Sequence, residues 1–208
     1  MRLGVIALLV AFVQIFWAEP VMVPTASMEK TVLVGDHYLL FKLPYGPRLP
    51  FTSLHLPRWG RVKHADIVAF TSPTDPQEVL VKRVVAVGGD SIEIRNTTVY
   101  VNGAKLNEPY AVFTKSASRS GDNMPRQIVP RGELFMLGDN RNNSQDSRFW
   151  GPVLEANVIG KPLWIFWSYN APSFAWLDPG VMHKLRFYAS VGTHLLANTR
   201  WSRLGIHL

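Results

Sequence analysis

The apolar run at residues 78–87 constrains the fold more than any other stretch of the sequence. It reads EVLVKRVVAV and ends in a Gly-Gly-Asp turn signal. An almost continuous apolar run of this length, rich in β-branched valine, is typical of a strand that is buried on both faces. Lys82 and Arg83 interrupt the run. Because successive side chains of a strand point to opposite faces, only one of these two cations can face a given partner.

Similar apolar runs elsewhere predict that most of the chain is β. The expected strands cover residues 34–42, 66–70, 91–95, 98–101, 133–137 and 158–168. The third and fourth of these are expected to pair around Asn96-Thr97, and Asn102-Gly103 is the best hairpin signal in the chain. Proline and glycine punctuate residues 43–60, which predicts a loop, and weak patterning over residues 105–131 predicts a small exposed insertion.

The tail, residues 183–196, carries a helical pattern instead. Leu185, Tyr188, Val191 and Leu195 recur at the three- and four-residue spacing of one helix face. A helix that packs on the core is the first interpretation of this pattern. A helix that lies at a membrane interface is the second.

Composition narrows the class of protein. The 208 residues suit one compact domain, and 47% hydrophobic with only 18% charged residues excludes a disordered chain. The net charge of +7 comes from basic residues spread along the chain. Attraction to anionic lipid headgroups explains this charge as well as nucleic-acid binding does, and we expect no nucleic-acid partner. The absence of cysteine excludes disulfides, thiolate metal sites and a catalytic cysteine.

The first residues form an apolar segment, unbroken from residue 3 to residue 17 except at Gln14. As a helix it would be about 22 Å long, shorter than the roughly 30 Å of a hydrocarbon core. A cleaved signal would need a small-x-small site, but Phe16-Trp17-Ala18 puts a bulky residue at the outer small position. We therefore expect residues 1–23 to form an uncleaved anchor. Arg2 predicts that the N-terminus lies inside and the bulk of the chain outside.

Ser27 is the candidate nucleophile. Its neighbours Thr25 and Ala26 are small enough for a substrate backbone to approach, and Pro24 favours extended geometry before them. A serine in such a string is more often a plain turn or helix-cap residue, so the case depends on a base. None of the six histidines lies in a recognisable motif and no G-x-S-x-G elbow is present, although a dispersed Ser-His-Asp triad stays open.

Lys82 is the alternative base. A lysine accepts a proton only when it is neutral, and burial or a neighbouring cation favours the neutral form. Lys82 lies among valines and precedes Arg83, so its position meets both conditions. The competing interpretation is a strand-end lysine whose ammonium group reaches solvent.

Four segments, taken in order, resemble the sequence boxes of the bacterial type I signal peptidases, which are membrane-bound Ser/Lys leader peptidases. The segments are 24–28 (PTASM), 66–70 (DIVAF), 81–90 (VKRVVAVGGD) and 138–148 (GDNRNNSQDSR). The resemblance covers about residues 22–165 and extends to the closing residues 200–207. It departs from the family pattern at Lys30, at Ala65 and at Val87-Gly88, and none of these is a catalytic position.

The resemblance implies an all-β fold of coiled antiparallel sheets of the signal-peptidase/LexA-like type, with an N-terminal transmembrane helix and a C-terminal helical tail. Residues 1–23 would be the membrane anchor and residues 24–208 the extracytoplasmic catalytic domain. A small insertion at about residues 96–130 would replace the large second domain of some members. No metal and no cofactor is implied.

The resemblance also implies a role for each site residue. Ser27 would attack the scissile carbonyl and neutral Lys82 would be the general base, while the Ser27 N–H and the Thr25 hydroxyl would form the oxyanion hole. Ser144 would hydrogen-bond the lysine ammonium. The remaining supporting residues are Asp146 paired with Arg148, Asp139 and Asn140 in the same loop, and Arg83 beside the lysine.

The function implied is removal of signal peptides from secretory preproteins, with cleavage after small residues at the first and third positions before the bond. The partners would be these preproteins and the lipid bilayer, at the bacterial inner membrane, with a single membrane pass and the catalytic domain on the periplasmic side. Two alternatives are a related Ser/Lys peptidase, acting in conjugative pilin maturation or as a self-cleaving repressor, and a catalytically silent membrane-tethered β-domain.

Overall fold

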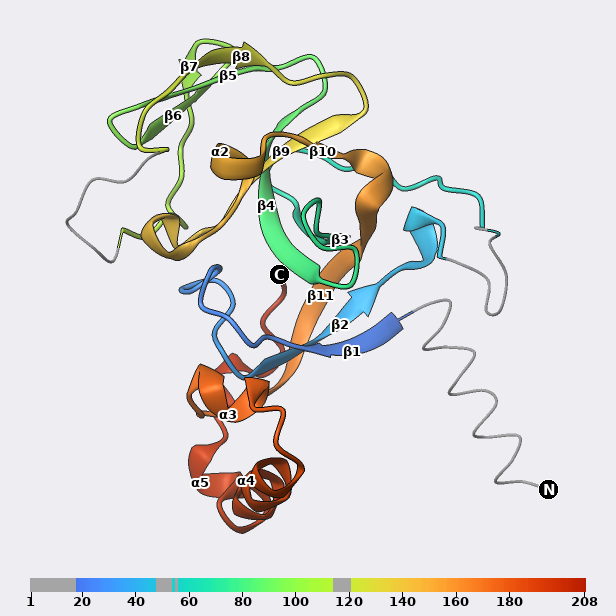
Figure 1. The fold of residues 1–208 in the computed structure, drawn as a ribbon, viewed down its shortest axis with the longest axis vertical. Coiled ribbons are helices and arrows are strands. Elements are labelled where there is room, and N and C mark those ends of the chain that lie inside the picture. Colours follow the sequence, from blue (N-terminus) through green and yellow to red (C-terminus); the bar gives the residue numbers. More distant parts are fainter. Residues whose placement is uncertain (1–17, 48–53, 55, 114–120) are drawn as a thin grey trace.

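Two antiparallel sheets organise the computed structural model, which describes residues 18–47, 54, 56–113 and 121–208 (Figure 1). The larger sheet has seven strands. In spatial order they are β1 (Ala18–Met22), β2 (Asp36–Phe41), β11 (Val158–Ser168), β3 (Ile67–Thr71), β4 (Val79–Val87), β9 (Glu133–Leu137) and β10 (Val153–Leu154). Every pairing in it is antiparallel, which confirms the mostly β prediction.

The smaller sheet has four strands. In spatial order they are β7 (Ala104–Lys105), β6 (Thr98–Val101), β5 (Ser91–Arg95) and β8 (Met124–Ile128). The predicted hairpin is confirmed, because Arg95 pairs with Thr98 and both turn residues between them have positive φ. Asn102 and Gly103, at 52° and 81°, make the second two-residue turn, as a type I′ turn requires.

Strand β8 corrects one prediction. It lies within residues 105–131, which the sequence predicts as a small exposed insertion and in which it predicts no particular strand, and it pairs with β5. It is an edge strand and all but one of its residues are exposed. A strand exposed in this way lacks the apolar alternation that identifies strands in a sequence.

Strand β1 differs from the prediction in the same manner. Ala18–Met22 were assigned to the end of the membrane anchor, but they form the edge strand of the larger sheet, paired with β2. Pro20 suits an edge, where one side of the backbone needs no ladder partner. The rest of the proposed anchor, residues 1–17, lies outside the described residues. In the part of the chain that the structure describes, no helix has the length and apolar character needed to span a membrane.

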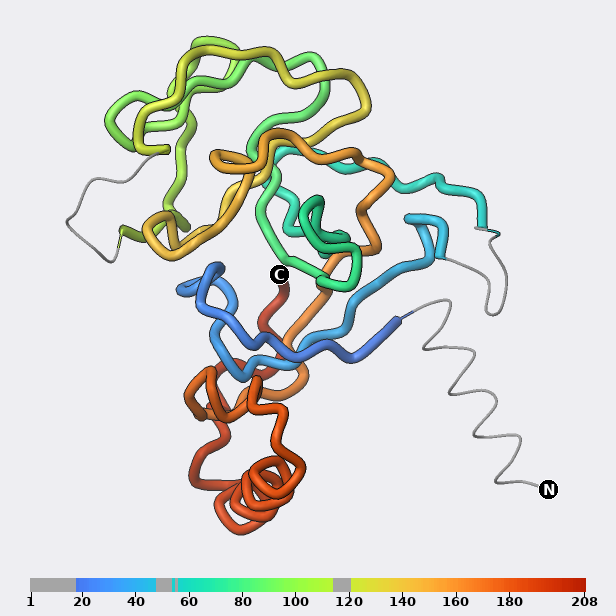
Figure 2. The backbone as a smooth tube through the Cα atoms, in the orientation of Figure 1, coloured from blue at the N-terminus to red at the C-terminus, as the bar shows by residue number. Residues whose placement is uncertain are grey.

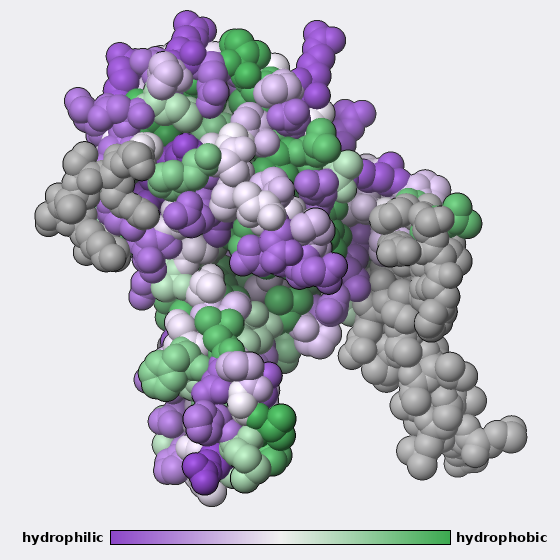
Figure 3. Space-filling model, viewed as in Figure 1, coloured by the Kyte–Doolittle hydropathy of each residue, from purple (hydrophilic) through white to green (hydrophobic). Residues whose placement is uncertain are grey.

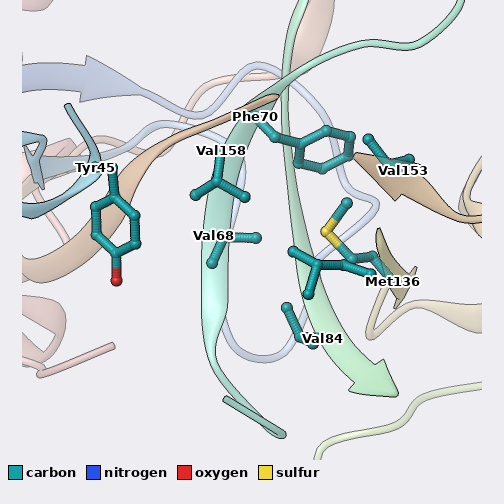
Figure 4. Close-up of a cluster of buried hydrophobic side chains, with 8 residues drawn as sticks. Tyr45, Val68, Phe70, Val84, Met136, Val153 and Val158 are labelled. Atoms are coloured by element: carbon teal, nitrogen blue, oxygen red, sulfur yellow. The ribbon is translucent and has the colours of Figure 1, made fainter. Parts of the chain in front are cut away.

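Strand β4 is buried on both faces, as its apolar run predicts. Val84 packs into a cluster with Val68, Phe70 and Met136 (Figure 4), and its neighbour Val85 belongs to a second cluster. The second cluster lies between the larger and smaller sheets: its members are Val85, Ala86, Ile92, Ile94, Val99, Val129, Phe135 and Leu137. The centre of β4 is therefore enclosed on both faces, and it carries Lys82 and Arg83.

A helical group forms one end of the molecule, opposite the smaller sheet (Figure 1). It consists of α3 (Ser173–Leu177), α4 (Val181–Thr193) and α5 (Leu195–Asn198). The predicted helical tail is therefore confirmed, but its predicted buried face is not. Of the four residues of that face only Val191 is buried, while Leu185, Tyr188 and Leu195 are exposed.

The end of the chain returns from the helical group to the larger sheet (Figure 2). Trp164 of β11 bridges to His207, and the Leu208 N–H donates to the Leu163 carbonyl at 2.8 Å. The 3-10 turn Trp201–Arg203 lies between these contacts and the helices. The last residues thus pack beside the strand that adjoins β2.

Candidate active site

Ser27 lies in the segment that joins β1 to β2. The next side chain, Met28, is buried with Val23 and Val32 in a third apolar cluster. The Val32 N–H donates to the Met28 carbonyl at 2.8 Å, which closes a helical turn directly after the serine. The small residues before Ser27 leave it half-buried, while the apolar residues after it fix the loop to the core.

Lys82 reaches this serine from the centre of β4. Its side chain is 2% exposed, and its Nζ donates a hydrogen bond to Ser27 Oγ at 2.7 Å. The two residues are 55 positions apart in the chain. The structure therefore brings the candidate nucleophile and the candidate base into direct contact.

Burial sets the ionisation of this lysine. It lowers the pKa of Lys82 from the ordinary value of 10.5 to about 8. The carboxylates of Asp146, Glu78 and Asp139 oppose this shift, and Arg148 assists it. With a pKa near 8, about one molecule in ten carries neutral Lys82 at pH 7, and about half do at pH 8.

Arg83 points away from the serine, as strand alternation requires. Its Nε and Nη2 donate to the two carboxylate oxygens of Asp139 at 2.8 and 2.7 Å, and its Nη1 donates to the Ala65 carbonyl at 2.9 Å. The guanidinium carbon lies 3.9 Å from the centre of the Tyr110 ring. Both members of the Arg83–Asp139 pair are buried, so this pair connects β4 to the polar loop at residues 138–148.

Asp146 and Arg148 form the second buried pair, within that loop. Arg148 donates through Nε and Nη2 to both Asp146 oxygens, each at 2.8 Å. Asp146 also accepts from the Gly138 N–H at 3.1 Å and from the Arg148 N–H, which caps the short helix α2 (Ser147–Trp150). These contacts hold the two ends of the loop together.

Asn140 joins the loop to the nucleophile turn. Its backbone N–H donates to the Ser27 carbonyl at 3.0 Å, and its Nδ2 donates to the Ala26 carbonyl at 3.2 Å and to Glu29 Oε2 at 3.1 Å. Sequence reasoning expected this asparagine to shape the loop. The structure shows in addition that it fixes the backbone on both sides of the nucleophile.

Ser144 does not make the predicted contact. It is buried, but its hydroxyl donates to the Gln145 carbonyl at 3.4 Å rather than binding Lys82. It packs instead against Gly138. A Cβ added at Gly138 would lie 2.6 Å from the Ser27 carbonyl oxygen and closer still to the Ser144 hydroxyl, so only glycine fits between the two serines.

A groove of about 450 Å³ opens beside the two candidate catalytic residues. Thr25 is exposed and lines the same groove as Ser27 and Lys82. Most of the remaining wall is apolar: Val21, Val23, Pro24, Met28, Val32, Tyr38, Val79, Leu80, Val81 and Leu177. A similar volume, about 480 Å³, lies beside the β6–β7 hairpin, and no candidate catalytic residue lines it.

Sequence reasoning missed two parts of this wall. Val21 lies in β1 and Val23 directly follows it, in a stretch that the sequence predicts as the end of an anchor. Leu177 ends α3, a helix that the sequence does not predict. Apolar residues such as these carry no chemical signal. Their place in the groove follows only from the pairing of β1 with β2 and from the return of the chain after β11.

No histidine among the described residues lines the groove. His64 pairs with Asp90 at 2.6 Å and His183 pairs with Asp178 at 2.7 Å, both at exposed positions. The geometry therefore favours lysine over histidine as the base for Ser27. Within the described ranges, no three His, Asp or Glu side chains gather closely enough to hold a metal ion.

Comparison with known proteins matches the chain to a family model described as signal peptidase, peptidase S26, over residues 1–167. It is 32% identical to signal peptidase I of Pseudomonas aeruginosa, over 81% of this chain and 72% of that protein. It is 36% identical to probable signal peptidase I-1 of Synechocystis, over 78% and 76% of the two chains. Signal peptidase I of Aquifex aeolicus is 30% identical over 98% of this chain and 95% of that protein.

Proposed function

Since the chain belongs to the signal peptidase family, peptidase S26, we propose that it removes signal peptides from secreted preproteins with a serine–lysine pair, Ser27 and Lys82. The observation that carries the assignment of the pair is the 2.7 Å hydrogen bond between Lys82 Nζ and Ser27 Oγ inside a buried strand. A silent β-domain would not need a buried lysine against a serine. The family membership favours signal-peptide removal over pilin maturation or repressor self-cleavage.

The first half of the reaction is acylation. Neutral Lys82 accepts the Ser27 hydroxyl proton while Ser27 Oγ attacks the scissile carbonyl carbon. The tetrahedral intermediate collapses when the Lys82 ammonium gives that proton to the leaving amine. The mature protein departs and the signal peptide stays esterified to Ser27.

The second half is hydrolysis of this ester. Lys82, neutral again, takes a proton from a water molecule that attacks the ester carbonyl. The ammonium then protonates Ser27 Oγ as the signal peptide leaves. One buried lysine thus serves as base and acid in both halves, which requires a pKa near the working pH.

The negative charge that develops on the carbonyl oxygen needs donors. We assign this role to the Ser27 N–H and the Thr25 hydroxyl. In the part of the chain that the structure describes, the Ser27 N–H makes no hydrogen bond to another protein group, and Thr25 lines the groove beside it. Both donors are thus available to the substrate.

The groove wall supports the proposed preference for small residues before the cleaved bond. Met28, Val32 and Tyr38 are buried bulky side chains that line the same groove as Ser27. They restrict the volume left for substrate side chains near the nucleophile. Alanine and glycine fit such a space at little cost, and larger side chains would need the core to move.

We place the enzyme at the bacterial inner membrane as a single-pass protein with its catalytic domain on the periplasmic side, in contact with the bilayer. The apolar residues 3–17 and Arg2 support this topology. Ala18–Met22 forms strand β1 of the catalytic domain, so the residues of the proposed anchor that remain are 1–17.

The test is cleavage of a model preprotein by the full chain, with N-terminal sequencing of the product. We expect a new N-terminus directly after a small-x-small site, and no product with Ser27→Ala, whose circular dichroism spectrum should match the native one. Native activity in Ser27→Ala would disprove the assignment of the nucleophile. Cleavage at pilin-type or internal sites alone would disprove signal-peptide removal.

A further inference from the structure

Helix α4 carries an exposed apolar face that the proposed peptidase site does not use. Val181, Leu185 and Tyr188 are 72%, 59% and 60% exposed, and they recur at helical spacing along one side. Met182, also exposed, lies at the edge of the same face. In Figure 3 hydrophobic side chains are visible beside hydrophilic ones at this end of the molecule.

This face is not the one that holds the helix to the protein. The inner face consists of Phe187 and Val191, and the Phe187 ring packs edge-to-face on Trp176 of α3 with their centres 4.8 Å apart. Tyr169 also contacts Phe187 at 6.4 Å. A helix that is apolar on two sides is normally buried on both, so we expect the outer face of α4 to be in contact with a partner that the protein itself does not supply.

The charges beside this apolar face indicate which kind of surface binds it. At 3.6 residues per turn, Lys184 and Arg186 fall on opposite borders of the apolar face, and both are exposed. The sequence contains no Asp or Glu after Asp178, whereas four Lys or Arg follow it. Asp178 pairs with His183 at the N-terminal end of α4, and α4 itself contains no acidic residue. An apolar stripe between two cations on such a helix complements an anionic lipid surface.

The length of the helix decides its orientation. Its 13 residues extend about 20 Å, too short for a hydrocarbon core of roughly 30 Å. We propose that α4 is an interfacial helix that docks this end of the molecule onto an anionic bilayer. Val181, Leu185 and Tyr188 enter the boundary between headgroups and acyl chains, and Lys184 and Arg186 bind lipid phosphates.

Docking by α4 places the groove at the membrane surface. Leu177, at the end of α3, lines the groove of Ser27, and only residues 178–180 separate it from α4 (Figure 1). This consequence rests on the proposed function: a preprotein held in the bilayer by its apolar segment would meet the groove without leaving the surface. The docking itself does not depend on peptidase activity.

The absence of cysteine allows a direct test. Leu185→Cys on the outer face and Ser190→Cys on a polar face of the same helix, both exposed positions, are each labelled with an NBD fluorophore in the full chain. Each is reconstituted into vesicles of phosphatidylglycerol and phosphatidylcholine that contain nitroxide-labelled acyl chains. We expect quenching at position 185 to exceed that at position 190 by roughly twofold or more, with a blue shift at 185 only.

Each other outcome overturns the proposal. Equal quenching at the two positions shows that α4 does not insert by this face. The same signal in vesicles of neutral phosphatidylcholine overturns the anionic surface. Quenching that appears only after a preprotein is added assigns the face to the substrate. A blue shift at position 185 that follows protein concentration rather than lipid assigns it to a second copy of the chain.

A charge variant separates docking from catalysis. Leu185→Glu/Tyr188→Glu should lose quenching and cleave a vesicle-embedded preprotein roughly tenfold more slowly, because two carboxylates oppose insertion. Its cleavage of a short soluble peptide should equal that of the native chain, and Ser190→Glu should change neither activity. Equal loss on both substrates would show a folding defect in place of docking and overturn the proposal. Lipid insertion without any cleavage by the native chain would disprove the proposed function alone.

Discussion

Lys82 combines two properties that oppose each other in water. It is enclosed by the core and yet retains hydrogen-bond contact with a hydroxyl group, Ser27 Oγ. Desolvation disfavours its ammonium form, while Asp146 and Asp139, each already paired with an arginine, attract a positive charge less than free carboxylates would. The balance leaves the pKa of Lys82 at about 8, between that of an ordinary lysine and that of a fully desolvated one.

This balance predicts a pH profile. Because only neutral Lys82 accepts the serine proton, kcat/KM for a peptide substrate should fall about tenfold per pH unit below an apparent pKa near 8 and level off above it. Initial rates between pH 5 and pH 10 measure this. A profile that stays flat through pH 8 would show that Lys82 is not the group that titrates.

The stability of Lys82→Met checks the same ionisation without catalysis. Since the folded pKa lies below the unfolded one, burying the lysine destabilises the native chain fully below pH 8, and the effect disappears as the pH rises to about 10.5. Lys82→Met should therefore be inactive but more stable than the native chain in mild acid, by about 3 kcal/mol at most. The advantage should shrink between pH 8 and pH 10. Lys82→Arg, which restores a charge but no base, should be inactive.

Thr25 supplies the second residue-level prediction. If its hydroxyl stabilises the oxyanion, Thr25→Val should lower kcat by about two to three orders of magnitude with little change in KM. Thr25→Ser keeps the hydroxyl and should retain most of the activity. Steady-state kinetics on a peptide substrate measure both variants, and equal effects from the two changes would indicate that Thr25 only packs.

The elements of the site meet at β4, because two loops bind to this strand. The nucleophile turn and the loop at residues 138–148 are joined by Asn140, and each also binds β4, through Ser27 and through Asp139. Gly138 lies where these parts are closest. Its φ is not in the left-handed region. Glycine is therefore needed here because a side chain would collide with its neighbours, and not because of the backbone conformation.

Gly138→Ala tests this close approach. The added methyl group would collide with the Ser27 carbonyl and the Ser144 side chain, so we expect a loss of about 1–3 kcal/mol of stability and a large fall in kcat. Gly192→Ala in α4 is the matched control, because nothing lies within 4 Å of its Cβ position. It should leave activity unchanged and stabilise the helix by roughly 0.5–1 kcal/mol. Thermal unfolding and peptide cleavage distinguish the two, and a neutral Gly138→Ala would contradict the packing.

Across the whole molecule, the end of the chain supports the loop that holds the nucleophile. Asp36, fully buried at the start of β2, accepts hydrogen bonds from Arg203 through Nε at 2.8 Å and through Nη2 at 2.6 Å. Ser168 of β11 donates to the same carboxylate at 2.6 Å. Arg203 also donates to the Thr31 carbonyl at 2.9 Å, and Arg200 binds the Val34 carbonyl. The C-terminal segment therefore closes the turn that begins at Ser27.

Removing Arg203 should show this long-range support. Arg203→Ala leaves the Asp36 carboxylate buried without its main partner, so we expect a loss of roughly 3 kcal/mol in the free energy of unfolding and reduced cleavage. Arg95→Ala breaks an exposed pair with Glu93 and should stay within about 0.5 kcal/mol of the native chain. Urea unfolding of the full chain in detergent compares them. Similar small losses in both variants would show that the C-terminal segment contributes no such support.

The local elements could be predicted from the sequence alone. β4 is indicated by an almost continuous apolar run, and the hairpin turns are indicated by residues at which positive φ is common, because these preferences act between near neighbours. Residue chemistry made Ser27 and Lys82 candidates, since only a few residue types can attack a carbonyl or accept its proton, and the resemblance of four segments to the signal peptidases singled them out as a pair. The edge strands β1 and β8 were not predicted, because exposed strands lack the apolar alternation that identifies a strand in a sequence.

Only the tertiary structure decided how these parts meet. Contacts between residues far apart in the chain set the 2.7 Å approach of Lys82 to Ser27 and the burial that lowers the lysine pKa. They also turned the Ser144 hydroxyl to Gln145, brought Leu177 into the groove wall and left the outer face of α4 exposed. Local preference cannot specify such contacts, because their energy comes from desolvation and packing that exist only once the sheets have formed.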